Sequence, residues 1–451
     1  MPIEISRRSL LRQSIAAALG LGTFGPSRLL AGTNPLAPRE SQFPAKAKRV
    51  ILFFMPGGVS HVDTFDPKPA LRRDHGKSVG NERVLTGSLW NSRPYGQSGL
   101  EISDLFPYTA QCADDLCLMR SLHGDKGDHF EATLSMHSGA MAGTLPGIGA
   151  WVSYGMGTDN PNLPSHVVFA ERLPYAGSQS WDSNFLPAYH QGTRITPGSE
   201  PIPNLSPDRA LAAYQAQELE LLSRLNARHR DARPGDTALD ARMYSFQAAV
   251  GLQRTAPEVF DLSDETADTL KLYGIDQNDR KSFAWQCLVA RRMSEQGVRF
   301  IELIDKGASG NWDAHSKMQS YDKLAANVDR GMGALITDLK QRGLLDETLI
   351  VWCTEFGRTP SAKVSAQDGR DHYKDAFTCW LAGGGVKGGM AYGATDEHGI
   401  GIVDNPVHIH DFHATILHLL GFDHTKLTYF YSGRDFRLTG LEGKVVQDIV
   451  A

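Results

Sequence analysis

The segment LITDLKQRGLLDETLIVWCTEFG, residues 335–357, decides the fold. It begins inside an amphipathic helix that we expect over residues 316–342, where apolar side chains recur at helical spacing. Gly343 follows as the predicted end of this helix, because glycine readily adopts the left-handed backbone conformation that closes helices. The continuous apolar run over residues 348–353 then predicts a buried strand. A helix, a tight turn and a buried strand in this order indicate an α/β fold.

Similar apolar runs recur on both sides of this segment and predict further buried strands. They cover residues 50–55, 116–122, 166–170, 298–304 and 377–382. Helical patterns separate several of them, including one that starts near Asp411 as its predicted N-cap. Strands that alternate with helices predict a three-layer α/β/α domain with a mostly parallel sheet. We place this domain at residues 45–451 and expect residues 172–295, which are loop-like and then helical and charged, to form a helical insertion or cap.

The composition argues against several classes of protein. Of the 451 residues, 41% are hydrophobic and 22% are charged, which is typical of a folded globular chain and excludes disorder throughout. Lys and Arg total 46 against 51 Asp and Glu, so the net charge of −5 argues against a nucleic-acid partner. The five cysteines form no Cys-x-x-Cys pair, which argues against a cysteine-based zinc site and a disulfide framework. The 16 histidines remain as a source of metal ligands and acid–base groups.

The first 40 residues predict an export signal and a linker. Arg7 and Arg8 precede a short apolar stretch, residues 15–24, and small residues follow it. The paired arginines resemble a twin-arginine signal, which implies the export machinery as a partner and a periplasmic or extracellular location. The apolar stretch is too short for a stable membrane span, and an amphipathic helix of the mature fold is the alternative.

Carboxylates and imidazoles follow the predicted strands at the points where the strands end. Seven of them are the metal-ligand candidates: His61, Asp63, Asp128, Asp313, His315, Glu355 and His372. The carboxyl ends of parallel strands meet at one edge of a sheet, so we expect the last four to converge there. Mixed oxygen and nitrogen ligands suit a divalent metal, with zinc preferred and manganese, calcium or magnesium as alternatives. Each residue alone also has a plainer interpretation, such as helix capping by Asp128.

Four further residues are candidates for catalytic roles. If a side chain attacks the substrate, His129 and Ser60 are the candidate nucleophiles, and a water activated by the metal is the alternative. Arg358 and Arg370 carry the planar fork of donors that binds anionic oxygens bidentately, so we expect one of them to steady the charge of the substrate. Surface salt bridges are the alternative role for both arginines.

The sequence resembles a superfamily that contains the sulfatases and the alkaline phosphatases. The Gly-Leu-Leu-Asp-x-Thr turn at residues 343–348, the strand after it and the later His372 are similar to that pattern. A narrower resemblance covers residues 48–450 and is to an exported bacterial family called domain of unknown function 1501. Its signatures lie at residues 55–69, 312–315, 354–360, 369–372 and 433–439.

This resemblance implies a metal-dependent hydrolase of phosphate or sulfate esters that acts outside the cytoplasm. Its substrate would be a small anionic ester or a sulfated or phosphorylated glycan. No cysteine is followed by the x-Pro-x-Arg pattern, and Asp128 and His129 stand where the superfamily places its nucleophile, so formylglycine chemistry is not expected. The alternative is a non-catalytic binding or structural protein that keeps the fold and part of the metal site.

The export signal can be tested by replacing both Arg7 and Arg8 with lysine. We expect the precursor to remain inside the cell, because the paired arginines are the feature that resembles a twin-arginine signal. Cell fractionation and the N-terminal sequence of the secreted protein check this, and the mature chain should begin between about residues 31 and 45. Normal export and cleavage of the double variant would contradict the twin-arginine route.

Overall fold

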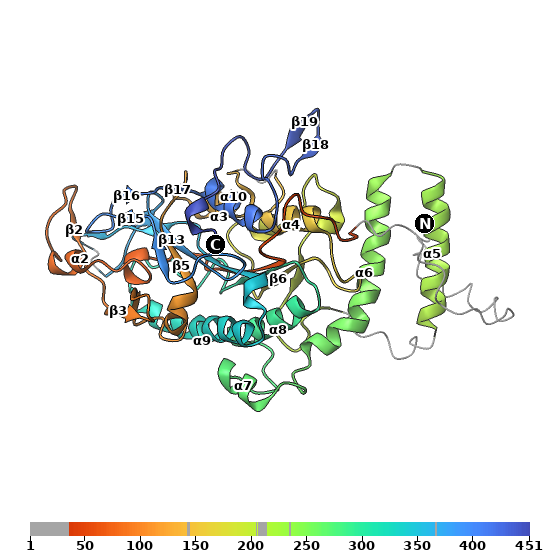
Figure 1. Cartoon of the computed structure of the whole chain (residues 1–451), viewed down its shortest axis with the longest axis horizontal. Helices are drawn as coiled ribbons and strands as arrows, with labels where there is room; N and C mark the ends of the chain where they lie inside the picture. Colours follow the sequence, from red (N-terminus) through yellow and green to blue (C-terminus); the bar gives the residue numbers. More distant parts are fainter. Residues whose placement is uncertain (1–35, 142–144, 204, 206–213, 234–235, 366–367) are drawn as a thin grey trace, which may run out of the picture.

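The computed structural model describes residues 36–141, 145–203, 205, 214–233, 236–365 and 368–451. The predicted signal segment, including Arg7, Arg8 and residues 15–24, lies outside the described residues. Figure 1 shows a central sheet with helices on both of its faces and a pair of helices that projects to one side. The predicted three-layer α/β/α class, with a mostly parallel sheet, is confirmed.

The central sheet has nine strands. Its order is β14 (Met390–Tyr392), β5 (Leu116–His123), β13 (Phe377–Ala382), β9 (Thr348–Cys353), β1 (Arg49–Phe54), β8 (Phe300–Ile304), β6 (His166–Ala170) and β7 (Thr193–Ile195), and β17 (Val407–His408) also pairs with β5. Within the described residues, only β13 runs antiparallel to its neighbours in this sheet. The start of β13 therefore lies at the edge where the carboxyl ends of its neighbours meet. Residues before β13 and residues after the other strands share one edge.

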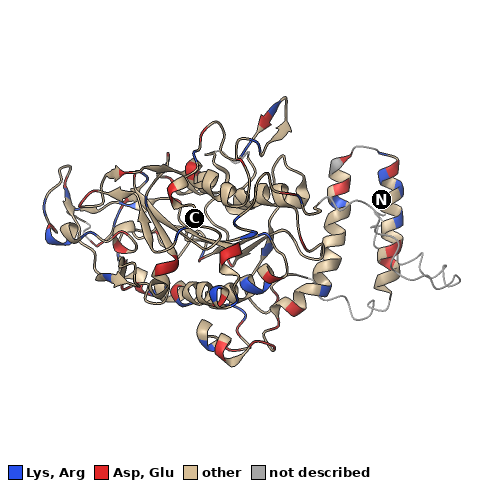
Figure 2. Cartoon of the chain, in the orientation of Figure 1, with Lys and Arg blue, Asp and Glu red and all other residues tan. Residues whose placement is uncertain are grey.

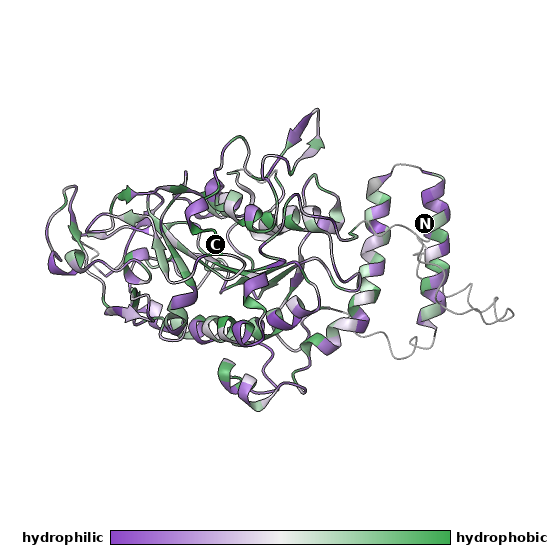
Figure 3. Ribbon diagram, viewed as in Figure 1, coloured by the Kyte–Doolittle hydropathy of each residue, from purple (hydrophilic) through white to green (hydrophobic). Residues whose placement is uncertain are grey.

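The central strands are buried on both faces because helices cover both. In β1, Ile51 and Phe53 pack into one apolar cluster, and Val50, Leu52 and Phe54 pack into the other. The first cluster includes α8 (Phe283–Glu295) and α9 (Ser320–Gln341), and the second includes α3 (His129–Ser138), α4 (Ile148–Met156) and α10 (Ile409–Leu419). The strands at the centre of the sheet are largely uncharged and apolar, whereas charged residues lie mainly on the helices and loops (Figures 2 and 3). This pattern explains the continuous apolar runs in the sequence.

The predicted insertion, residues 172–295, divides into parts with different positions. β7 joins the edge of the sheet, and α8 packs in the core beside α9. The projecting part is the pair α5 (Gln215–Asp231) and α6 (Thr237–Phe260), and no residue of α5 is buried. The short α7 (Ala267–Tyr273) packs against α9.

Two helix ends differ from expectation in detail. The α9 helix ends with Arg342 as its C-cap, and Gly343 follows with a φ of 68°, as a left-handed closing residue should. The N-cap of α10 is His408 and not Asp411, which lies three residues later and completes the capping box with its carboxylate.

The remaining short elements surround the core. They are α2 (Pro69–Arg73), β2 (Arg83–Leu85) paired with β11 (Ser361–Lys363), β3 (Ser92–Tyr95) with β4 (Leu100–Ser103), β10 (Gly357–Arg358) with β12 (His372–Tyr373), β15 (Ala394–Thr395) with β16 (Ile402–Asp404), and β18 (Tyr429–Tyr431) with β19 (Arg434–Phe436). The 3₁₀ helices cover His61–Asp63, Thr109–Asp115, Gly177–Trp181, Ala188–His190, Leu345–Glu347 and Gln447–Ile449. In the part of the chain that the structure describes, no helix combines the length and the apolar character needed to cross a bilayer.

A buried charged pair joins α3 to the sheet. His137 Nε2 lies 2.8 Å from Glu302 Oε1 of β8, and His137 Nδ1 lies 2.7 Å from the Thr133 carbonyl oxygen. Both ring nitrogens therefore face acceptors and both carry hydrogen. Burial lowers the pKa of His137, but Glu302 and the Thr133 carbonyl outweigh it and raise the pKa above its ordinary value.

This pair predicts a pH-dependent effect of the Glu302→Gln substitution. The raised pKa of His137 stabilises the fold fully below about pH 6.5, and this stabilisation is lost as the pH rises through the raised value. We therefore expect Glu302→Gln to lower the free energy of unfolding by about 3 kcal/mol near pH 6 and by less near pH 9. Chemical denaturation at both pH values measures this. Glu347→Gln is the control and should have little effect at either pH, because the partly exposed Glu347 forms only surface ion pairs with Lys48 and Arg49. An equal loss at both pH values would contradict it.

Candidate metal centre

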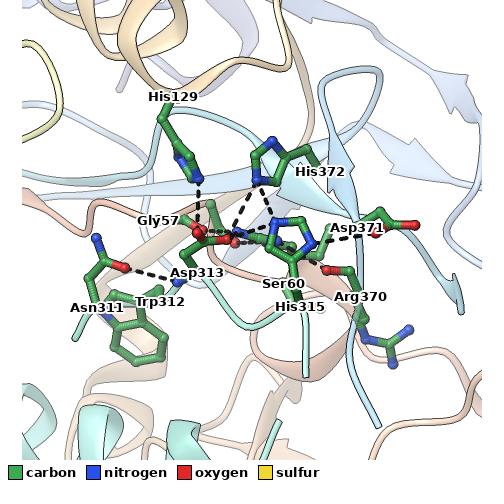
Figure 4. A network of polar contacts seen from close by, with 12 residues as sticks. Gly57, Ser60, His129, Asn311, Trp312, Asp313, His315, Arg370, Asp371 and His372 are labelled. Carbon is green, nitrogen blue, oxygen red and sulfur yellow. Dashed lines mark hydrogen bonds and ion pairs between the residues drawn. The ribbon is translucent and has the colours of Figure 1, made fainter. Parts of the chain in front are cut away.

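Four side chains from distant parts of the chain converge at the carboxyl edge of the sheet (Figure 4). They are His129, the first residue of α3, Asp313 and His315 in the loop after β8, and His372 in β12. The ligand atoms of His129, Asp313 and His372 all lie within 4.8 Å of one another. His315 Nε2 lies 3.1 Å from Asp313 Oδ1 and 2.9 Å from His372 Nε2. Asp313, His315 and His372 therefore converge as predicted, Glu355 lies behind them against His129, and His129 joins the cluster.

Two of the three imidazoles are held in one tautomer by close acceptors, and the third faces its acceptor at a longer distance. The Nδ1 acceptors are Glu355 Oε1 for His129 (2.7 Å), the Gly127 carbonyl oxygen for His372 (2.7 Å) and Asp371 Oδ1 for His315 (3.4 Å). Carboxylate and carbonyl oxygens only accept hydrogen bonds, so each Nδ1 carries the hydrogen and each neutral ring keeps a lone pair on Nε2. Metal-ligating histidines are oriented in this way by outer carboxylates and carbonyls.

The Nε2 atoms fit a divalent metal. His129 Nε2 is buried without a hydrogen-bond partner, although Asp313 Oδ2 lies 3.3 Å away. The Nε2 atoms of His315 and His372 face each other at 2.9 Å, an arrangement that needs a proton or a cation between two lone pairs. Three imidazole nitrogens and one carboxylate oxygen are a ligand set that suits zinc and several related divalent ions.

Without a metal ion, protons occupy part of this centre. Burial lowers the pKa of His129, but Asp313 and Glu355 outweigh it and raise that pKa to about 9. Burial acts in the opposite sense on Asp313, yet His129, His372 and Arg358 hold the pKa of this carboxyl well below its usual range. Metal binding at this centre therefore has to displace a proton from His129.

Glu355 orients a ligand and does not itself lie among the ligand atoms. Its Oε1 accepts from the Gly57 backbone N–H (2.8 Å) as well as from His129, and its Oε2 lies 3.2 Å from Thr354 Oγ1. The residue is 1% exposed. Its oxygens are satisfied by the protein, so the predicted ligand role is replaced by that of an outer carboxylate that fixes His129.

Arg358 is a buried clamp and not a free anion-binding group. Its Nε donates to the Gly58 carbonyl (2.9 Å), its Nη1 to the Arg370 carbonyl (3.0 Å), and its Nη2 to the Gly57 carbonyl and to Asp313 Oδ1 (2.5 Å). Gly57 and Gly58 have φ values of 116° and 71°, and a Cβ at Gly57 would stand 2.4 Å from the Asp313 nitrogen. All three guanidinium nitrogens are engaged and the residue is 0% exposed, so the predicted contact with substrate is not supported.

The other predicted residues near the first strand form a separate buried network. Arg370 Nε and Nη2 lie 2.6 Å and 3.2 Å from the two carboxylate oxygens of Asp63, and Ser60 Oγ donates to Asp63 Oδ2 (2.6 Å). His61 Nε2 contacts the Gly399 carbonyl oxygen (2.9 Å). These four residues are almost fully buried and have their own partners, so the structure brings none of their side chains into the ligand cluster. The structure therefore does not support the predicted ligand roles of His61 and Asp63, the nucleophile role of Ser60 or the anion-binding role of Arg370.

Asp128 caps α3, which was the plainer of its two interpretations. Its side chain accepts from the backbone nitrogens of Phe130 (3.0 Å) and Glu131 (3.5 Å). The carboxylate therefore satisfies the free N–H groups of the first turn, where an anion would otherwise bind. His129 is the residue that this cap sets in place at the start of the helix.

Several residues of the site were missed in the sequence. The Tyr175 ring stacks on the His129 ring with centroids 4.0 Å apart and planes 7° apart, and the Phe356 ring packs against His129 and His372. Tyr175 follows β6, and polar residues after strands are the candidates at this edge of the sheet, but Tyr175 lies within residues 172–295, which the sequence predicts to be an insertion or cap. Burial raises the pKa of Tyr175 to about 12, so the phenol keeps its proton.

The comparisons place the chain in a family and beside distant structures. The model of the family described as "Protein of unknown function (DUF1501)" matches residues 47–450. No curated protein matches the chain. Among solved structures, the chain is similar to a protein in the alkaline phosphatase superfamily from Vibrio parahaemolyticus, with 10% identity, a TM-score of 0.36, and coverage of 96% of this chain and 78% of that one.

Two further solved structures are similar to the chain at the same level. The PsFucS1 sulfatase from Pseudoalteromonas sp. has 12% identity and a TM-score of 0.34, with 83% of this chain and 68% of that one covered. The phosphonate monoester hydrolase SpPMH from Silicibacter pomeroyi has 12% identity and a TM-score of 0.35, with 86% and 75% covered. At such low similarity, the chemistry of the centre has to be inferred from its own residues.

The clamp predicts a large loss of stability for Arg358→Lys. A lysine keeps the charge, but its single ammonium group cannot reach four acceptors, and buried carbonyl oxygens then lose their donor. We expect the free energy of unfolding of the metal-free protein to fall by about 2–4 kcal/mol, measured by chemical denaturation. Arg93→Lys is the matched control, because the Arg93 side chain is 63% exposed and its loss should change stability little. Equal stability of the two variants would contradict the clamp.

Proposed function

The chain belongs to the DUF1501 family, and from the geometry of its centre we propose that it is a metal-dependent hydrolase of phosphate or sulfate esters. Its export is proposed from the paired Arg7 and Arg8 of the sequence. The observation that carries the proposal is the set of three imidazoles whose Nδ1 atoms are held by acceptors while their Nε2 atoms face one carboxylate. Its substrates are small anionic esters or sulfated or phosphorylated glycans.

The proposed ligands are His129, His315 and His372 through Nε2, together with Asp313. Zinc is the preferred metal for this set, and manganese, calcium and magnesium are the alternatives. When bound, the metal would supply Lewis acidity toward an ester oxygen and toward water. Arg358 contacts Asp313 Oδ1, which also faces His315 Nε2 (3.1 Å) and His372 Nε2 (3.5 Å), whereas Oδ2 faces His129 Nε2 (3.3 Å).

The centre opens toward solvent on one side. The side chain of His315 is 48% exposed, whereas that of His129 is 12% exposed and that of Glu355 is 0% exposed. A substrate therefore approaches past His315, while the inner side of the cluster is closed by Glu355 and Arg358. The ligands are thus fixed by residues on the buried side of the centre and accessible on the solvent side, as a catalytic centre requires.

Water is the nucleophile that this arrangement favours. The five cysteines are all buried and free, and burial raises the pKa of their thiols, for example that of Cys353 well above its ordinary value. Ser60 is buried and donates a hydrogen bond to Asp63 Oδ2. His129 has both ring nitrogens directed at carboxylates. None of these groups is presented to a substrate, whereas water reaches the exposed side of the centre.

A specific observation favours the alternative function, a binding protein without turnover. The nitrogens of both arginines expected to hold the substrate are occupied by the protein itself, and Asp128 occupies the N–H groups at the start of α3. A centre of this kind retains the metal scaffold but has fewer charged groups for a developing anion. Measured turnover decides between the two functions.

Metal analysis and an ester screen of the full chain test the proposal together. We expect about one zinc per chain and hydrolysis within a panel of phosphate and sulfate esters. His129→Ala should remove most of the metal and the activity, and Glu355→Gln should weaken metal affinity by about 10–100-fold, because glutamine lacks the negative charge that raises the basicity of His129 toward a metal. His229→Ala on the exposed α5 is the matched control and should change neither.

Three results would contradict parts of this proposal. Full metal content and activity after His129→Ala would exclude the assigned centre. Formylglycine-type chemistry would be supported by an aldehyde detected at any cysteine by mass spectrometry. It would also be supported if replacing a cysteine by alanine abolished activity while the metal was retained. A fully metallated protein without turnover on either class of ester would establish the non-catalytic alternative.

A further inference from the structure

Tyr175 covers one face of a proposed metal ligand and comes from a strand end that the other site residues do not use. It lies five residues after β6, whose carboxyl end shares the edge at which the ligands converge. Its ring stacks on His129, and its hydroxyl contacts Asn311, which lies two residues before Asp313. Tyr175 is half-buried, so its hydroxyl group can be shielded by the protein and still meet a bound molecule.

Among the residues that the structure describes, the hydrogen bonds of Asn311 leave the hydroxyl proton of Tyr175 with only a long contact to an acceptor. Asn311 Oδ1 accepts from the Asp313 N–H (3.1 Å), and Asn311 Nδ2 donates to the Gly307 carbonyl (2.7 Å), which fixes the orientation of the amide. The second Nδ2 hydrogen is donated to the Tyr175 oxygen (3.1 Å). The Tyr175 proton then meets Asn311 Oδ1 only at 3.5 Å, which is too long for a strong bond.

The charges around the centre favour a substrate with one negative charge. Three carboxylates touch or form the ligand set, namely Asp313, Glu355 and Asp371. Two arginines balance two of them: Arg358 contacts Asp313, and Arg83 Nη1 lies 2.6 Å from Asp371 Oδ2. With neutral histidines, a divalent metal brings the local charge to +1, which one anionic charge neutralises.

We propose that Tyr175 is a substrate-contacting residue whose hydroxyl donates a hydrogen bond to an oxygen of a singly charged tetrahedral group, a sulfate ester or a phosphate diester. The inference rests on the proposed function and narrows its substrate class. The neutral phenol donates the hydrogen bond that an arginine would otherwise provide, because the donors of Arg358 and Arg370 are bound to acceptors inside the protein. A doubly charged phosphate monoester would leave a net negative charge at a half-buried centre.

Two analogues that cannot be hydrolysed test the charge and the donor separately. Benzenesulfonate and phenylphosphonate have the same shape, but near pH 9 the first carries one charge and the second carries two. On the zinc-loaded full chain, titration calorimetry should show tighter binding of benzenesulfonate. Tyr175→Phe should weaken that binding by about tenfold, the value of one hydrogen bond to a charged oxygen, with the zinc content unchanged.

The matched control is Tyr373→Phe. Tyr373 is next to His372, but its hydroxyl donates to the Ile400 carbonyl, so the substitution should leave the affinity for benzenesulfonate unchanged. Unaltered affinity in Tyr175→Phe, or loss of zinc from that variant, would overturn the assignment of the donor. Tighter binding of phenylphosphonate would overturn the charge assignment. If neither analogue binds to zinc-loaded wild-type protein, the proposed function itself fails.

Discussion

The Arg358 guanidinium holds together the loops that build the centre. Its donors bind the carbonyls of Gly57 and Gly58 after β1, the carbonyl of Arg370 before β13, and the carboxylate of Asp313 after β8. One buried cation thus sets the spacing of three loops that are far apart in the sequence. The three carbonyl oxygens would be left unsatisfied in the interior without it, which costs more than an apolar contact could return. The positions of the proposed ligands depend on this contact.

The direction of a single strand brings the last ligand to the others. Most strands of the sheet are parallel, so the residues that follow β5, β8 and β9 meet at one edge. β13 runs the other way, and His372 therefore reaches that edge by preceding its strand. The pairing of β10 with β12 places Arg358 opposite His372, so the clamp and the ligand share one short ladder. The strand order and the Arg358 contacts therefore position the same few residues.

The centre divides the work of its charged groups between structure and chemistry. Arg358, Arg370 and Asp63 are buried and paired within the protein. The Glu355 carboxylate accepts hydrogen bonds from His129 and from the backbone. What remains partly exposed is imidazole, the carboxylate of Asp313 and a neutral phenol. Such a site attracts a substrate through its metal more than through cationic side chains. This distinguishes the proposed hydrolase from a site built on free arginines, and it also explains why a pure binding function competes with it.

The sequence by itself determined the α/β class, six of the strands, and the residues that stand at strand ends, including Asp313, His315 and His372, because apolar runs and the residues after them are local properties. The tertiary structure alone decided which polar residues are ligands and which are supports. Glu355 and Asp313 both follow strands, yet the former faces an imidazole Nδ1 and the latter an Nε2. Tyr175 and Asp371 acquire roles only through distant partners. Burial and hydrogen-bond direction depend on contacts between residues that are far apart in the sequence, so a local sequence pattern cannot predict them.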